Sequence, residues 1–110
     1  PADFAEKQGA VLKQFDGNYQ CLQELQNGGS DAVAIDKAVA LYYVSKGGMN
    51  NLKVVGEPKK LAGSAMAIDK GHDDELKAIN QALAELKADG TYTKLYQKWF
   101  GVDPTAEELQ

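Results

Sequence analysis

The chain has 110 residues, of which 44% are hydrophobic and 25% are charged, and its formal net charge is −4. This composition is typical of one small globular domain, and the excess of acids argues against nucleic acid as a partner, because such binding needs a basic face. No apolar run approaches the ~20 residues that cross a bilayer, so direct membrane insertion is not expected.

The first half of the sequence alternates helical and strand-like segments. A short helix is predicted over 3–8, and a strand follows over 10–15 (AVLKQF). Asn18 can cap the next helix, in which apolar residues recur at helical spacing. The run 31–36 (DAVAID) is small and apolar without polar alternation, which is typical of a strand covered on both faces. A helix over 37–46 comes next, and paired glycines end it.

Two further strands are predicted over 52–55 (LKVV) and 64–68 (SAMAI). Strands that alternate with helices indicate an α/β fold, here a three-layer sandwich with a mostly parallel sheet. In such sheets ligands bind outside the carboxyl ends of the strands, which makes Asp36 the candidate substrate-binding residue. Its carboxylate could accept a charge-assisted hydrogen bond from a ligand ammonium, or it could cap the following helix. The two roles are compatible.

The last part of the sequence predicts two successive helices. Three acids at 73–75 suit the first turn of a long amphipathic helix, where the helix dipole favours negative charge. Thr91 can cap the second helix. That helix carries an aromatic stripe, which at helical spacing indicates core packing more than a stacking platform. The stripe consists of Tyr92, Tyr96 and Trp99.

Residues with reactive side chains do not form a recognisable catalytic or metal-binding motif. Cys21 is the single cysteine, so no intramolecular disulfide is possible, and it is either a small buried residue or a reactive thiol. His72 is the single histidine and lacks the partner of an HExxH motif. We therefore expect no metal, no cofactor and no enzymatic activity. All twelve basic residues are lysines, so a bidentate arginine grip on a carboxylate must come from elsewhere.

Three stretches together carry a family resemblance: DAVAIDKAVALYYVSK, then LKVVGEP, then AIDKGHDDELKAINQALAELKADGTYTKLYQKWFG. In this order they resemble the second half of the polar amino-acid-binding proteins of bacterial ABC importers, which are type II periplasmic binding proteins. The most specific part is KADGTY followed by a helix that ends in KWFG. The resemblance extends from about Phe4 to Gly101.

The resemblance implies a two-lobed α/β fold that holds a free amino acid in the cleft between the lobes, with the carboxylate of Asp36 on the ligand's α-ammonium. It also implies a membrane permease as partner of the intact protein and a periplasmic or extracytoplasmic location. On this basis the chain is predicted to comprise a second-lobe segment without its first strand (1–63), a C-terminal strand and helices that return to the first lobe (64–101), and an acidic tail (102–110). From its composition and terminal position alone, the part 105–110 is expected to be loose.

Family members are considerably longer, and their first lobe supplies the arginine that holds the ligand's carboxylate. The main hypothesis is therefore a fragment, split or engineered half of an amino-acid receptor, which needs its missing lobe or a second chain for full affinity. The alternative is a scaffold fragment that forms a swapped or partner-complemented oligomer and binds no ligand alone. An enzyme, as among two-lobed dehydratase relatives, would need an acid or base in the cleft.

Overall fold

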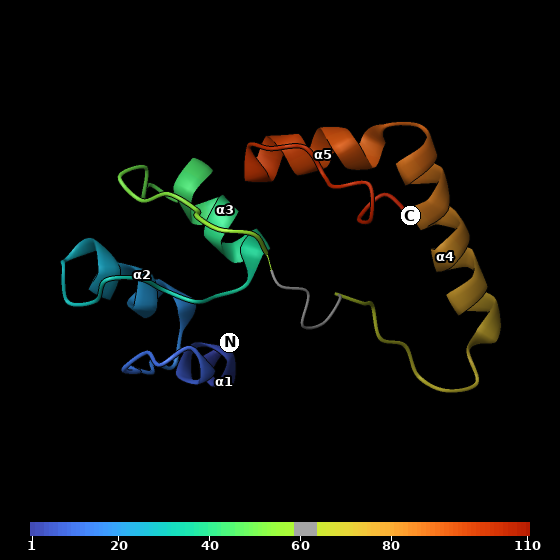
Figure 1. Cartoon of the computed structure of the whole chain (residues 1–110). Coiled ribbons are helices and arrows are strands. Elements are labelled where there is room, and N and C mark those ends of the chain that lie inside the picture. The colour runs from blue at the N-terminus through green and yellow to red at the C-terminus, as the bar shows by residue number, and fades with distance from the viewer. Residues whose placement is uncertain (59–63) are drawn as a thin grey trace. The chain divides into compact units, whose positions relative to one another are not determined.

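The computed structural model describes residues 1–58 and 64–110, and this part of the chain contains five α-helices (Figure 1). They are α1 (Ala2–Lys7), α2 (Asn18–Gln26), α3 (Lys37–Ser45), α4 (Asp73–Ala88) and α5 (Thr91–Phe100). The chain divides into two compact units, Pro1–Gly56 and Glu57–Gln110. The predicted boundary between 63 and 64 adjoins residues outside the described part, so the predicted division into segments stays a prediction.

The predicted α/β sandwich with a parallel sheet is wrong, because residues 1–58 and 64–110 contain no strand. The four segments expected to form strands run as irregular connections: 10–15, 31–36, 52–55 and 64–68. Outside the helices, every backbone hydrogen bond between described residues joins positions at most six apart, as in turns and caps. A strand requires a ladder of bonds to a neighbour, and apolar patterning measures only a local preference. The exposure of the side chains also argues against a sheet, because Val11, in the predicted strand 10–15, is 98% exposed.

The ends of α3 and the start of α4 agree with the sequence, whereas two predicted caps are wrong. Asn18 and Thr91 are the first residues of α2 and α5, and the N-cap positions are Gly17 and Gly90. α3 starts directly after Asp36 and stops before Gly47 and Gly48. Gly48 has a φ of +82°, a left-handed conformation that strains other residues. A Cβ at Gly47 would lie 2.7 Å from the Cα of Tyr43, so the close approach of the chain to α3 also requires glycine. The three acids at 73–75 lie in the first turn of α4, as predicted.

Unit Pro1–Gly56 is stabilised by a few buried apolar side chains and by hydrogen bonds and an ion pair near the end of α2. Leu22 and Met49 are only 4% and 3% exposed. The Nζ of Lys13 lies 2.7 Å from Oε1 of Glu24 and donates to the carbonyl of Gly29 at 2.8 Å. These contacts fasten the connection between α1 and α2 to the last turn of α2. Exposed ion pairs stabilise little, so the buried side chains carry most of the packing energy.

Unit Glu57–Gln110 is built on the contact between α4 and α5 (Figure 1). Tyr96 is 7% exposed, and its ring lies between Tyr92 (centroids 6.1 Å apart) and Phe100 (4.7 Å, edge-on). Trp99, however, is 48% exposed. The expected core role of the aromatic stripe is therefore confirmed for Tyr96 and wrong for Trp99.

The C-terminal tail, expected to be loose, folds back along α5 toward α4 (Figure 1). The backbone N–H of Glu108 donates to the hydroxyl of Thr105 (3.3 Å), and the Thr105 N–H donates to the Glu108 carboxylate (2.7 Å). This reciprocal pair is a capping box, which nucleates a helical turn. The hydroxyl of Tyr96 donates to the same carboxylate at 3.0 Å, and Pro104 is buried.

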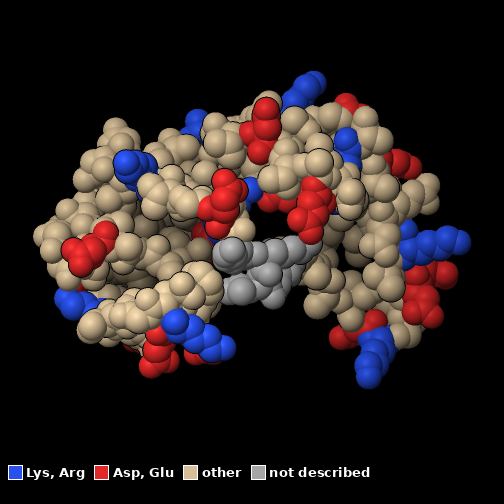
Figure 2. Space-filling view, in the orientation of Figure 1, with Lys and Arg blue, Asp and Glu red and all other residues tan. Residues whose placement is uncertain are grey.

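The chain exposes more surface than a compact protein of its mass. Its accessible area is 8675 Å². Two separate compact units of half its 11.9 kDa would expose about 7,200 Å² together. On the face shown in Figure 2, uncharged atoms cover most of the surface, and lysines and acids are interspersed among them. Leu76, Leu95 and Trp99 are among the large apolar side chains exposed by 40% or more.

Candidate functional site

The side chain of Asp36 is fixed at the N-terminus of α3. Its Oδ1 accepts a hydrogen bond from the backbone N–H of Ala38 at 2.9 Å, and its backbone carbonyl accepts from the N–H of Ala40 at 3.0 Å. The residue has extended backbone angles (φ −58°, ψ 135°), and its side chain is exposed. The capping role predicted for Asp36 is thus confirmed, while its role in ligand binding stays a prediction.

The position of Asp36 suits a carboxylate that must keep one orientation, because the capping bond holds its Oδ1 against the first turn of α3. Because Oδ1 accepts the capping bond, a ligand ammonium would donate its hydrogen bond to Oδ2. An ionised carboxylate only accepts hydrogen bonds, so this position selects cationic or donor groups.

The helix that follows Asp36 is apolar on all sides. Between Lys37 and Ser45 its sequence is AVALYYV, and none of its residues is buried. Tyr42 remains 38% exposed, and its ring packs edge-on against Tyr43 with centroids 5.4 Å apart. Helices that are apolar on every side are normally covered on every side. α3 therefore presents apolar surface that residues 1–56 leave half-exposed.

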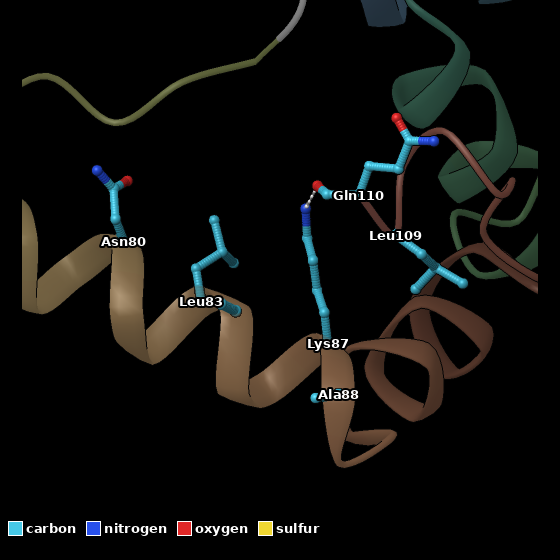
Figure 3. Close-up of a pocket in the computed structure, with 7 residues that line it drawn as sticks. Asn80, Leu83, Lys87, Ala88, Leu109 and Gln110 are labelled. Atoms are coloured by element: carbon cyan, nitrogen blue, oxygen red, sulfur yellow. Dashed lines mark hydrogen bonds between the residues drawn. The ribbon is translucent and has the colours of Figure 1, made fainter.

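A second candidate site is a shallow pocket of about 380 Å³ between α4 and the tail (Figure 3). Asn80 and Leu83 project from the same side of α4 as Lys87, and the tail approaches from the other side. Lys87 is already engaged, because its Nζ donates to the backbone oxygen of Gln110 at 2.8 Å and lies 5.4 Å from the ring centroid of Tyr92. The pocket lining is Asn80, Leu83, Ala84, Lys87, Ala88, Leu109 and Gln110. Lys87 is the one titratable side chain in this lining.

The remaining reactive residues lie apart from both places. Cys21 is half-buried in α2, which leaves both predicted readings open. The Nδ1 of His72 lies 3.5 Å from Oε1 of Glu75 at the start of α4, on an exposed surface. Among residues 1–58 and 64–110, no three histidine, cysteine or acidic side chains gather as metal ligands would. In the same part of the chain, no helix is both long and apolar enough to span a bilayer.

Two contacts were missed in the sequence, and one of them has a sequence signal. Before α5, whose N-cap position is Gly90, the Oδ1 of Asp89 accepts from the N–H of Thr91 at 2.8 Å. Hydrogen bonds from the Thr91 side chain and then its N–H hold the pKa of Asp89 below the usual value of 3.8. The capping box of the tail is visible as Thr-x-x-Glu at 105–108.

Comparison with protein families gives a match over residues 4–102 to the bacterial extracellular solute-binding proteins, family 3. The chain belongs to this family. The family predicted from the sequence is therefore confirmed, and so is the extracytoplasmic location at the level of the family. The matched range ends at Val102, just before the tail that folds onto α5.

Individual relatives are binding proteins for amino acids. The chain is 40% identical over 98 residues to the L-cystine-binding protein TcyJ of Escherichia coli, covering 89% of this chain and 36% of TcyJ. It is 34% identical over 99 residues to the L-cystine-binding protein TcyA of Bacillus subtilis (90% and 37%). It is 35% identical over 103 residues to a putative amino-acid ABC transporter-binding protein, PatH, of Vibrio harveyi (91% and 40%).

The chain thus spans between 36% and 40% of the length of these three relatives. The expected fragment-like size is confirmed by this coverage. No solved structure matches the chain significantly.

Proposed function

We propose that the protein contributes to the capture of a free amino acid for an ABC importer, with L-cystine as the first ligand to test. The observation that carries this proposal is the 40% identity to an L-cystine-binding protein over 89% of the chain. A second L-cystine-binding protein, from a distant bacterium, is 34% identical over a similar range. The family consists of solute-binding proteins, which supports binding without catalysis.

In this proposal Asp36 is the anchor of the ligand's α-ammonium. Its support is the geometry of the carboxylate, which is exposed and is oriented by the Ala38 N–H. The ligand's α-carboxylate needs a cationic partner. Since the chain contains no arginine, that partner is a lysine or belongs to another part of the receptor.

The proposed partners are the rest of the receptor, as a first lobe or a second chain, and the membrane permease of the importer. The support is that the chain spans about a third of its relatives' length and that α3 is apolar on all sides without a buried residue. A half-exposed apolar helix gains roughly 25 cal/mol for each Å² that a partner covers. Full affinity for the amino acid therefore depends on this second surface.

The experiment is a thermal-shift titration of the chain with L-cystine, using three variants. Asp36→Asn removes the charge but keeps a side-chain oxygen that caps helices almost as well. Asp31→Asn is the matched control, because it removes an exposed charge from the same segment. Asp36→Ala removes both the cap and the charge. A ligand at ~100 times its dissociation constant adds roughly 2.7 kcal/mol, which corresponds to several degrees for a domain of this size.

We expect the shift to survive Asp31→Asn and to vanish in Asp36→Asn, whose own melting temperature should stay close to that of the parent chain. A shift that persists in Asp36→Asn would refute the ammonium anchor. If neither L-cystine nor any of the twenty standard amino acids produces a shift, the chain alone is not a receptor. The same titration with the relative's remaining segment added in trans then decides whether capture needs it.

The alternative function, a scaffold that is completed by a second copy, is favoured by the exposed apolar surface of α3. Sedimentation velocity between micromolar and millimolar concentrations separates the two. A stable dimer that ignores amino acids supports the scaffold, and a monomer stabilised by L-cystine supports the receptor.

A further inference from the structure

The tail covers part of α5, and the residues of the tail lie beyond the range that matches the family. Residues matched to the family end at 102, and the contacts begin just beyond, where Gln97 Nε2 donates to the carboxylate of Asp103. Pro104 is buried, and Glu108 accepts from the hydroxyl of Tyr96 at 3.0 Å. These contacts lie within unit Glu57–Gln110. A segment outside the family's shared sequence thus occupies a defined place on α5.

The tail adopts its bound shape through its own sequence. The capping box between Thr105 and Glu108 satisfies two backbone N–H groups reciprocally, and the N–H of Leu109 donates to the Thr105 carbonyl at 3.2 Å. The carboxylate of Glu108 therefore accepts two hydrogen bonds: Oε2 accepts from the N–H of Thr105 and closes the turn, and Oε1 accepts from the hydroxyl of Tyr96. The turn and its attachment to α5 form together.

The surface beneath the tail is complementary to a short acidic turn. Tyr96 offers a hydroxyl donor to Glu108. The ammonium of Lys87 reaches the backbone oxygen of Gln110 from α4 (Figure 3). Leu109 and Leu83 supply apolar walls to the pocket between them. The face therefore offers the turn at 105–110 one hydroxyl donor and one cation, with the apolar side chain of Leu83 on α4 close by.

We propose that this face of α4 and α5 is a binding site for a short acidic peptide turn, and that residues 103–110 occupy it as a detachable latch. A tethered segment competes at an effective concentration on the order of millimolar, so the latch stays closed although each contact is weak. When it opens, Tyr96 and the apolar surface around it become available. The inference is independent of the amino-acid-binding function proposed above.

The experiment measures nitration of Tyr96 by tetranitromethane, located by mass spectrometry in the full chain. Glu108→Ala removes both acceptors of the latch, and Glu108→Gln keeps one acceptor and a side chain that still suits a capping box. Asp69→Ala is the control, because it removes an exposed acid from the same unit outside the tail. Tyr19, which is 46% exposed in the other unit, is the internal standard. Circular dichroism checks that the variants keep their helices.

In Glu108→Ala we expect the exposed fraction of Tyr96 to rise from 7% toward the 46% of Tyr19. If the latch opens fully, nitration of Tyr96 should be roughly sixfold faster than in the parent chain. Glu108→Gln should restore most of the protection, and Asp69→Ala should leave it unchanged. Adding the peptide DPTAEELQ at millimolar concentration to Glu108→Ala should protect Tyr96 again, and the same peptide with alanine in place of its second glutamate should not.

Two results overturn the proposal. If Glu108→Ala nitrates Tyr96 no faster than the parent chain, the tail does not control access to α5. If Tyr96 becomes reactive but the free peptide never protects it, the face does not bind an acidic turn.

Discussion

Replacing Leu22 with alanine tests whether a very small apolar centre holds the unit that carries Asp36. Leu22 is 4% exposed, and beside Met49 it is one of two large buried apolar side chains among the described residues of Pro1–Gly56. Leu→Ala changes in protein cores cost about 2–5 kcal/mol. The lower part of this range, about 2–3 kcal/mol, applies here because sparsely packed neighbours can collapse into the space. A unit of this size is stabilised by only about 3–8 kcal/mol in total.

The assay is urea unfolding followed by hydrogen exchange of the α2 amides, with Val11→Ala as control because Val11 is 98% exposed. Leu22→Ala should lower the free energy of unfolding of this unit by about 2–3 kcal/mol, and the control should change it by less than about 0.5 kcal/mol. The fluorescence of Trp99 reports on the other unit and should change little. If Leu22→Ala is as mild as Val11→Ala, burial of Leu22 does not hold this unit together, and the reasoning fails.

Three further predictions concern helix ends. Protonation of Asp89 should loosen the start of α5, because the pKa of Asp89 is lower in the folded than in the unfolded chain. The charged carboxylate therefore stabilises the fold fully above the usual pKa of 3.8, and this stabilisation is lost as the pH falls through the lower pKa of the folded state. Amide exchange of Thr91 between pH 5 and 2 measures this, and Asp89→Asn should flatten the profile. Gly47→Ala should cost about 1–3 kcal/mol, because a Cβ there meets the backbone of α3; urea unfolding that matches the parent chain would contradict the close approach. Asp36→Ala should lower stability by about 1 kcal/mol, and Asp36→Asn by much less; equal losses in chemical denaturation would exclude the capping bond.

The helices could be predicted from the sequence because their signals are local. The acids at 73–75, the cap at Asp36 and the glycines after α3 act within one or two helical turns of the backbone that they fix. The predicted strands failed because pairing is not local. The run 31–36 has the composition of a buried strand, yet the described residues provide it with no partner ladder.

The candidate site was predictable only in part, for a related reason. The position of Asp36 before an apolar helix predicted its capping bond, which the structure contains. The attachment of the tail depends on Tyr96 and Glu108, which are twelve positions apart and meet only after α5 ends. The Thr-x-x-Glu pattern at 105–108 predicts the turn itself, but it does not indicate where on the protein the turn docks.

The two features of α3, its cap and its apolar surface, are thermodynamically linked. Isolated helices shorter than about 12–15 residues are marginal in water, and α3 has 9 residues with none buried. The carboxylate of Asp36 is oriented only while the first turn of α3 is formed, because the Ala38 N–H that holds it belongs to that turn. A partner that covered α3 would therefore stabilise the geometry of Asp36, and by reciprocity the proposed ligand at Asp36 would strengthen the binding of that partner.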